Sequence, residues 1–247
     1  MTPVEWPALA RALAWIMAAA FAIGSVLLAL LAFDVFGAPP APQQDFIDTV
    51  VAEFAWLESL WPIEFVGTAL FALGFLVLGG LGPALSRLAG PTDARGGLVS
   101  AALIGAGGLG AASQLVWLGA RPVATSSEYC ECGLEAEEVM SRLGVLGAAA
   151  EIQVWLVTGA LLAGAVGFMV AGRLGREAGM PAGWWWLSVV TAVLALAVVL
   201  LVVGDAFPIN VLVTVLVAGI LVPIWALWLA TRAWDIWPRS EAFAGTT

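Results

Sequence analysis

The sequence contains no histidine and no lysine, so that all 9 of its basic residues are arginines. Without histidine, the usual ligation of haem, the HExxH zinc site and Ser-His-Asp catalysis are excluded. Without lysine, a Schiff base with retinal or pyridoxal phosphate and a P-loop are excluded. The arginines are also too few and too scattered for binding to nucleic acid. We therefore expect neither enzymatic activity nor a cofactor.

Charged residues of either sign are scarce as well, at 11% of the 247 residues, against about a quarter in soluble domains. Apolar residues make up 62% of the chain. This composition predicts an all-α, polytopic membrane protein that forms a single transmembrane domain over residues 1–247. Six runs are long enough to cross a bilayer core of about 30 Å as helices. They cover residues 11–34, 62–86, 97–119, 149–172, 184–204 and 210–232.

The arginines predict the orientation of these six spans, because cytoplasmic loops of membrane proteins are enriched in basic residues. Most arginines fall on one side, whereas the opposite side carries most of the acidic residues, in loops 35–61 and 120–148. Both termini are therefore predicted to be cytoplasmic and the acidic loops to face outward. The absence of lysine beside abundant alanine, glycine and arginine points to a GC-rich bacterial genome, and hence to a bacterial cytoplasmic membrane.

Both outer loops also contain helical patterns. Residues 45–60 place Phe46, Val50, Phe54 and Leu57 at helical spacing with acidic residues between them. This spacing predicts an amphipathic helix on the outer surface that runs into the second span. Acidic residues crowd the first turn after Gly133, as a helix N-terminus favours, and this helix is expected to continue into the fourth span.

The second and fourth spans resemble each other. Each begins with a glutamate at its outer end, Glu64 or Glu151, and ends with arginine near a proline at its inner end. The similarity indicates either a repeated helical hairpin, spans 2–3 and 4–5, or the chance likeness of low-complexity apolar sequence. It predicts a core of spans 2–5, flanked by spans 1 and 6, with an outward-facing polar vestibule. The candidate vestibule residues are Glu64, Gln114, Glu151, Gln153 and Asp205.

Each vestibule residue has two interpretations. An intramembrane acid such as Glu64 can bind a cation, relay protons or coordinate a substrate amine. Alternatively, because it follows Pro62, Glu64 is a first-turn acid that interacts with the helix dipole and reaches headgroup water. Glu151 has the same two interpretations. Gln114 and Gln153 are either ligands or interhelical hydrogen-bonding groups, and Asp205 is either part of the vestibule or a helix cap.

Both cysteines, Cys130 and Cys132, lie in the second outer loop. With Glu131 and Glu135, they are candidates for a soft-metal site, although two thiolates are too few for a closed zinc site. They are equally candidates for a redox pair, a link to a partner chain or a structural disulfide.

Small residues and one proline bear on the helix packing. Glycines such as Gly67, Gly74, Gly107 and Gly167 on spans 2, 3 and 4 would let these helices approach closely. Pro223 is expected to kink the sixth span, because it removes a backbone hydrogen bond.

The C-terminal quarter carries a family resemblance. A proline precedes a tryptophan-rich entry to span 5, "PAGWWWL", and span 6 closes on "PIWALWLATRAW". These motifs resemble a bacterial family of six-helix membrane proteins known as domain of unknown function 4386. The resemblance implies six spans and no assigned activity, and it carries over no functional residue. The cysteine pair departs from it.

The sequence therefore favours an integral membrane protein without enzymatic activity, in contact with the lipid bilayer and with a membrane-protein partner or further copies of itself. It would be a subunit or accessory factor of a membrane complex. One alternative is a small cation- or proton-coupled transporter that uses Glu64 and Glu151. A second alternative is an outer-face redox or metal protein that uses Cys130 and Cys132.

Overall fold

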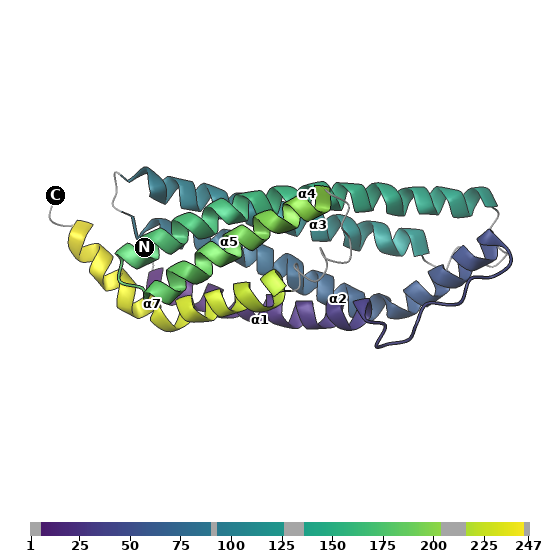
Figure 1. Cartoon of the computed structure of the whole chain (residues 1–247), viewed down its shortest axis with the longest axis horizontal. Helices are drawn as coiled ribbons and strands as arrows, with labels where there is room; N and C mark the ends of the chain where they lie inside the picture. The colour runs from purple at the N-terminus through teal and green to yellow at the C-terminus, as the bar shows by residue number, and fades with distance from the viewer. Residues whose placement is uncertain (1–5, 90–92, 126–135, 204–215, 245–247) are drawn as a thin grey trace, which may run out of the picture.

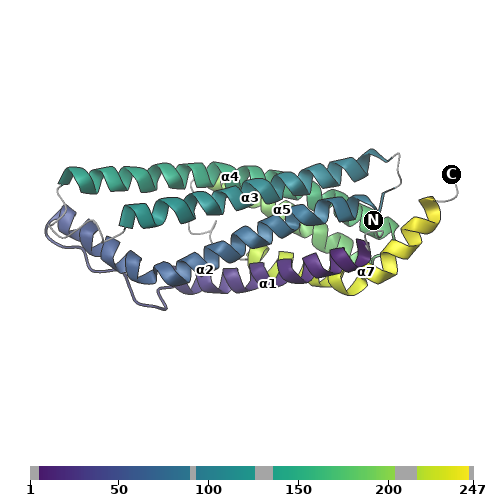
Figure 2. The ribbon, with the colours of Figure 1, turned by 180° about the vertical axis from the view of Figure 1, so that it is seen from behind.

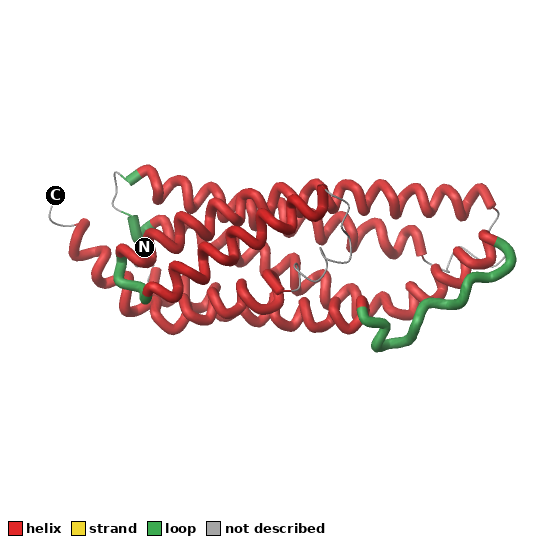
Figure 3. The backbone as a smooth tube through the Cα atoms, viewed as in Figure 1, coloured by secondary structure: helices red, strands yellow, loops and turns green. Residues whose placement is uncertain are grey.

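The computed structural model describes residues 6–89, 93–125, 136–203 and 216–244. Within these ranges the chain forms long helices and no strand (Figure 1, Figure 3). The elements are α1 (Trp6–Ala32), α2 (Phe46–Ser86), α3 (Ala94–Thr125), α4 (Ala136–Glu177), α5 (Ala182–Val203), the π-helical turn η2 (Val217–Leu221) and α7 (Val222–Ala244). Six helical segments are long and apolar enough to cross a membrane. The prediction of an all-α polytopic bundle is confirmed.

The helices run up and down in a single bundle. Each helix from α1 to α5 packs against its neighbours in the chain, and α1 also packs against α7 and η2. The start of α1 and the end of α7 lie toward the same end of the bundle (Figure 1, Figure 2). An even number of crossings produces this arrangement, as the six predicted spans require.

Three helices extend beyond the others at the opposite end. α2 has 41 residues and α4 has 42, so that each is about 60 Å long at 1.5 Å per residue. The N-terminal part of α2, the C-terminal part of α3 and the N-terminal part of α4 project past α1 and α5 (Figure 2). We call residues 46–61 and 136–148 the outer extension, because the arginines predict that this end of the bundle faces outward. The predicted loops 35–61 and 120–148 are therefore largely helical wherever the structure describes them.

Asp45 caps the N-terminus of α2, and its side chain accepts a hydrogen bond of 2.8 Å from the backbone N–H of Ile47. The helix continues through Pro62 without a break. Val50 and Phe54, which were predicted to lie on one face, are buried against Val139 of α4. The apolar face of this amphipathic segment is therefore covered by protein, and the packing supplies the stability that a proline takes away.

Two helices end in left-handed turns. At the end of α1, Asp34 has φ of 53° and Val35 N–H donates to the carbonyl oxygen of Leu30. At the end of α4, Gly179 has φ of 103° and Met180 N–H donates to Gly175. Both are Schellman-type ends, which favour glycine or a short polar residue in the left-handed position. They explain why α1 and α4 stop where they do.

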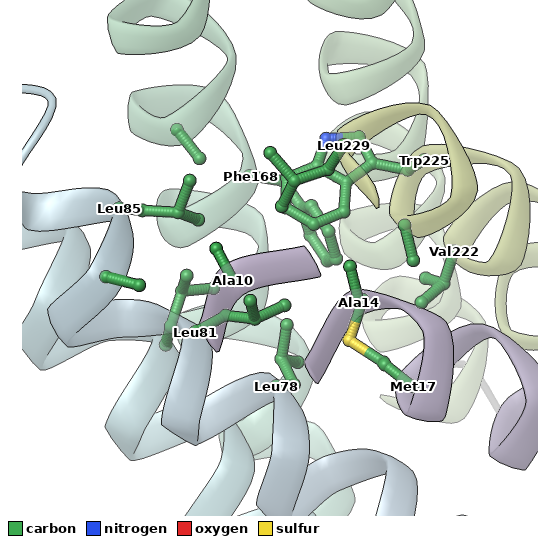
Figure 4. Close-up of a cluster of buried hydrophobic side chains, with 14 of the residues drawn as sticks. Ala10, Ala14, Met17, Leu78, Leu81, Leu85, Phe168, Val222, Trp225 and Leu229 are labelled. Atoms are coloured by element: carbon green, nitrogen blue, oxygen red, sulfur yellow. The ribbon is translucent and has the colours of Figure 1, made fainter. Parts of the chain in front are cut away.

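The hydrophobic core draws on all six helices, so that spans 1 and 6 do not merely flank a core made by spans 2–5. Ala14 and Met17 of α1 lie beside Leu78 of α2, and Phe168 of α4 lies beside Trp225 of α7 (Figure 4). The ring of Trp225 is perpendicular to Phe168 at 5.0 Å. These side chains are fully or almost fully buried.

A second contact locks α5 to α7. The indole rings of Trp184 and Trp225 stack with centroids 5.0 Å apart. Trp225 Nε1 donates to Ser188 Oγ at 2.8 Å, and Ser188 Oγ donates to the carbonyl oxygen of Trp184 at 2.9 Å. Trp184 Nε1 in turn donates to the carbonyl oxygen of Trp225 at 3.3 Å. Both indoles are 0% exposed, so each indole N–H needs its acceptor.

The predicted close approach of the helices occurs at particular glycines. A Cβ atom on Gly107 of α3 would lie 2.5 Å from the backbone oxygen of Phe75 and 2.7 Å from Cα of Gly79. At Gly74, a Cβ atom would lie 3.0 Å from the ring of Phe21. A Cβ atom on Gly108, by contrast, would meet nothing within 4 Å. Backbone-to-backbone contact between α2 and α3 therefore centres on Gly79 and Gly107.

Pro223 is the second residue after the π-helical turn η2, in the first turn of α7. Val222 N–H donates to the carbonyl oxygen of Val217, which is one residue further back than in an α-helix. Proline removes a donor and crowds the preceding turn, and a π-turn is one way in which a helix adapts to such a disruption. The irregularity expected at Pro223 takes the form of this wider turn.

Candidate functional site

A buried ion pair joins α2 to α3 near the outer extension. Arg121 Nη2 lies 3.0 Å from Glu64 Oε2, and Arg121 Nε donates to the same oxygen at 3.1 Å. Two guanidinium N–H groups therefore converge on one carboxylate oxygen, and Nε also lies 3.4 Å from Oε1. The Arg121 side chain is 3% exposed and that of Glu64 is 15% exposed. Solvent screening of the pair is therefore weak.

Trp117 completes the arrangement. Its Nε1 donates to Glu64 Oε1 at 2.7 Å, and Trp117 lies one helical turn before Arg121 on α3. Arg121 Nη2 also lies 3.4 Å from the carbonyl oxygen of Leu57, which it contacts as a weak donor. Glu64 thus has donors on both oxygens, and its negative charge is balanced by Arg121.

A pocket of about 380 Å³ adjoins this ion pair. Its polar lining consists of Glu64, Arg121 and the indoles of Trp56 and Trp117. Its apolar lining comes from the end of α1, from α2 and from one residue of α4, and consists of Leu28, Leu31, Ala32, Leu57, Leu60 and Leu146. The pocket therefore lies where α1 ends and the outer extension begins. Its volume is within the range of small-molecule sites, toward the lower end.

Two of the residues that line this pocket each carry a side-chain N–H without an acceptor in the part of the chain that the structure describes. These donors are Nη1 of Arg121 and Nε1 of Trp56, and both atoms are buried. A buried donor without a partner costs about 1–3 kcal/mol, and more when it is charged. Such groups are rare in folded proteins, and an unseen ligand or water is one common explanation. This pocket is therefore the strongest candidate binding site among the described residues.

The predicted vestibule residues do not gather here. Gln114 of α3 is buried and donates to Ser113 Oγ at 3.1 Å, and it is not part of the pocket wall. Glu151 is exposed on α4, and Gln153 is partly exposed. Asp205 lies outside the described residues, as do Cys130 and Cys132. Of the four predicted vestibule residues that the structure describes, Glu64 alone lines this pocket.

One interpretation of Glu64 is wrong. Because α2 begins at Phe46, Glu64 is far from a helix N-terminus and is not a first-turn acid next to the positive end of a helix dipole. Arg121 falls within the predicted outer loop 120–148 and was not predicted as a site residue, whereas the structure places it in α3. A signal was present, because Glu64 and Trp117 lie at nearly equal distances along the chain from the α2–α3 turn. An antiparallel hairpin brings such positions to the same depth.

Charged groups also connect helices at the other end of the bundle. Arg95 Nε donates to Asp93 Oδ2 at 2.8 Å, and its Nη1 lies 2.8 Å from Glu177 of α4. Hydrogen bonds from Arg95 are the main cause of a lowered pKa at Asp93. This link holds the start of α3 to the end of α4.

No group of three or more cysteine, aspartate or glutamate side chains within the described ranges is arranged to hold a metal ion. Comparison with models of protein families gave no match, and searches of curated proteins and of solved structures gave none either. The residues of this chain are therefore the basis for any functional proposal.

Proposed function

We propose that this integral membrane protein acts as a subunit or accessory factor of a membrane complex, without enzymatic activity, in the cytoplasmic membrane of a bacterium. Its outer extension would face away from the cytoplasm and would dock the partner. The observation that carries the proposal is the extension itself. α2 and α4 are about twice as long as a bilayer core requires. Their N-terminal parts pack against each other through a small apolar cluster of their own.

The charge of the extension supports a partner with a basic surface. Asp48, Glu53 and Glu137 are exposed on it, whereas Glu138 forms an ion pair of 2.7 Å with Arg142. Exposed charges of one sign add little to the stability of a fold. Across an interface, however, they guide association and select partners of opposite charge.

The transporter alternative has less support. The two acids that a transporter would use are in different environments, since Glu64 is paired with Arg121 whereas Glu151 is exposed on α4. A carboxylate whose charge is already balanced by a buried guanidinium is poorly suited to bind and release a cation. The redox alternative depends on Cys130 and Cys132, which lie outside the described residues.

The C-terminal motifs support a further proposal, membership of the six-helix family known as domain of unknown function 4386. Such membership implies six spans and no assigned activity, so it agrees with a subunit or accessory factor but does not identify the partner.

Co-purification tests the docking proposal. The tagged chain is extracted from its native membrane in mild detergent, and its stoichiometric partners are identified by mass spectrometry. The variant Asp48→Asn with Glu53→Gln removes two charges from the extension. The control variant Asp34→Asn with Glu151→Gln removes two exposed acids elsewhere.

We expect a partner that is retained by the wild-type chain and by the control, and that is reduced at least severalfold by the extension variant in a salt-dependent manner. A chain that purifies without any stoichiometric partner would contradict the proposal. Equal retention by both variants would place the interface elsewhere and would contradict the role of the acidic extension.

A further inference from the structure

The pocket beside the Glu64–Arg121 pair has a particular combination of properties. Its walls are mainly leucine, with a small number of polar groups at one place. Two of those polar residues, Arg121 and Trp56, each carry a buried N–H without an acceptor among the described residues. An apolar cavity with a few convergent polar groups is the usual form of a ligand site. A ligand that supplies a hydrogen-bond acceptor would satisfy these donors. Neither nitrogen has accessible surface, so the side chains of Arg121 and Trp56 must shift slightly to present them to the pocket.

The charge balance of the site restricts what this acceptor is. Arg121 is already neutralised by Glu64 through two hydrogen bonds to Oε2. An anionic ligand would bring a second negative charge close to Glu64 in a weakly screened site. A neutral acceptor, such as a carbonyl oxygen, accepts from the free N–H groups and adds no charge. The site therefore favours an uncharged carbonyl group attached to an apolar body.

The depth of the pocket identifies the source of such a group. The residues Leu28, Leu31 and Ala32 are at the C-terminal end of α1, the end from which the outer extension continues. A helix of 27 residues spans about 40 Å, so that this end reaches the headgroup region of the bilayer. Trp56 and Trp117 agree with this depth, because tryptophan is enriched at membrane interfaces. The ester carbonyls of glycerolipids lie at the same level, between headgroups and acyl chains.

We propose that this pocket binds one glycerolipid of the surrounding leaflet, with an ester carbonyl oxygen accepting hydrogen bonds from Arg121 and Trp56. The first part of an acyl chain packs against Leu28, Leu31 and Leu60. A volume of about 380 Å³ holds the ester region and the start of a chain, and the rest of the lipid stays in the bilayer. The lipid fixes α1 to the base of the outer extension.

The sharpest test changes only the carbonyl group of the lipid. The full-length chain is delipidated in detergent and titrated with dioleoylphosphatidylcholine or with its dioleyl ether analogue, which has the same headgroup and chain length but no ester carbonyl. Native mass spectrometry counts the bound lipids, and the midpoint of thermal unfolding reports their effect. We expect one tightly bound ester lipid and at least about fivefold weaker binding of the ether lipid.

Two variants locate the site. Trp56→Phe keeps an aromatic ring and removes the N–H, and it should weaken binding of the ester lipid about fivefold while leaving the ether lipid almost unchanged. Trp155→Phe is the matched control, because Trp155 is 71% exposed on α4 and lies outside the pocket. Should Trp56→Phe fail to fold, Leu31→Trp fills the pocket and leaves both donors in place. That variant should lose the bound lipid.

Other outcomes overturn the proposal. Equal affinity of the wild-type chain for ester and ether lipids would exclude recognition of the carbonyl. Tighter binding of oleate than of the ester lipid would assign the pocket to an anionic amphiphile. If the wild-type chain retains no lipid, the pocket holds water instead. If Leu31→Trp retains lipid as well as the wild type does, the lipid binds elsewhere.

Discussion

At the scale of single residues, the ion pair between Glu64 and Arg121 is the most consequential feature. Two opposite charges leave water at large cost, and their attraction offsets that cost only when the hydrogen bonds are well formed. Here Trp117 and the backbone of Leu57 provide further polar contacts. The pair therefore fixes the relative position of α2 and α3 at the level of the pocket, and each partner depends on the other.

We expect Arg121→Gln to lower the free energy of unfolding by about 3 kcal/mol, because it leaves Glu64 charged and buried without its counter-ion. Glu64→Gln should cost at least as much, because it leaves the guanidinium of Arg121, which is 3% exposed and cannot lose its charge, without a counter-ion. The double variant should be more stable than the sum of the single losses predicts. Equilibrium unfolding of the four proteins in mixed micelles measures this coupling. Strict additivity would mean that the two side chains do not interact energetically.

Asp93 provides a second test at this scale. Its pKa is lowered from the ordinary value of 3.8, first of all by the side-chain hydrogen bond from Arg95. A group with a lowered pKa in the folded state stabilises that state above its ordinary pKa, and the contribution is lost as the pH falls. Asp93→Asn should therefore unfold at lower temperature than the wild type at pH 7, and the difference should shrink toward pH 3. A difference that stays constant with pH would refute this linkage.

At the scale of helices, the sequence predicts which segments are helical better than it predicts where each helix begins and ends. Apolar runs and helical spacing predict six spans and the amphipathic segment before the second one, because periodicity determines which face is buried. The start of α2 at Phe46 was harder to predict, because Pro62 taken by itself favours a helix that begins there. Packing of Val50 and Phe54 against α4 outweighs that signal. Arg121 was missed because a lone charge at the end of a span is typical of a loop.

Gly107 offers a prediction about helix packing. Gly107→Ala would bring a methyl group to 2.5 Å from the backbone oxygen of Phe75, and backbone atoms cannot move aside as a flexible side chain can. We expect α2 and α3 to separate, at a cost of about 1–3 kcal/mol, with a lower midpoint of thermal unfolding.

The adjacent Gly108 is the matched control, since a Cβ atom there meets nothing within 4 Å. Gly108→Ala should be neutral or slightly stabilising, because alanine favours helices more than glycine does. If both variants unfold at the same temperature, the close contact at Gly107 does not hold the two helices together.

At the scale of the whole molecule, three of the described helices project beyond the others at one end of the bundle. The asymmetry comes from α2, α3 and α4, whereas α5 has 22 residues, close to the length that a bilayer core requires. The arginines predict which side is which. The acidic extension is expected on the outer side, and the link between Arg95 and Glu177 on the cytoplasmic side.

Selective labelling tests this orientation. Cys130 and Cys132 are the two cysteines of the chain, so after mild reduction they should react with a membrane-impermeant maleimide on intact cells. In a background with Cys130→Ser and Cys132→Ser, Ala89→Cys should react only after permeabilisation, because it follows α2 at the opposite end. The reverse pattern would invert the orientation and would contradict the prediction from the arginines.

The order of Glu64 and Arg121 along the chain has a consequence for biogenesis. A growing polypeptide enters the membrane from its N-terminus, so the acid arrives before the base. In the orientation that the arginines predict, the outer end of α3 must carry Arg121 through the lipid, at a cost of about 2.5–3.5 kcal/mol at the centre of the bilayer. Glu64, on the preceding helix, enters the membrane first and is expected to neutralise that charge. We therefore expect α2 and α3 to enter the membrane as a hairpin whose two charges cancel, and Glu64→Ala to slow the insertion of α3.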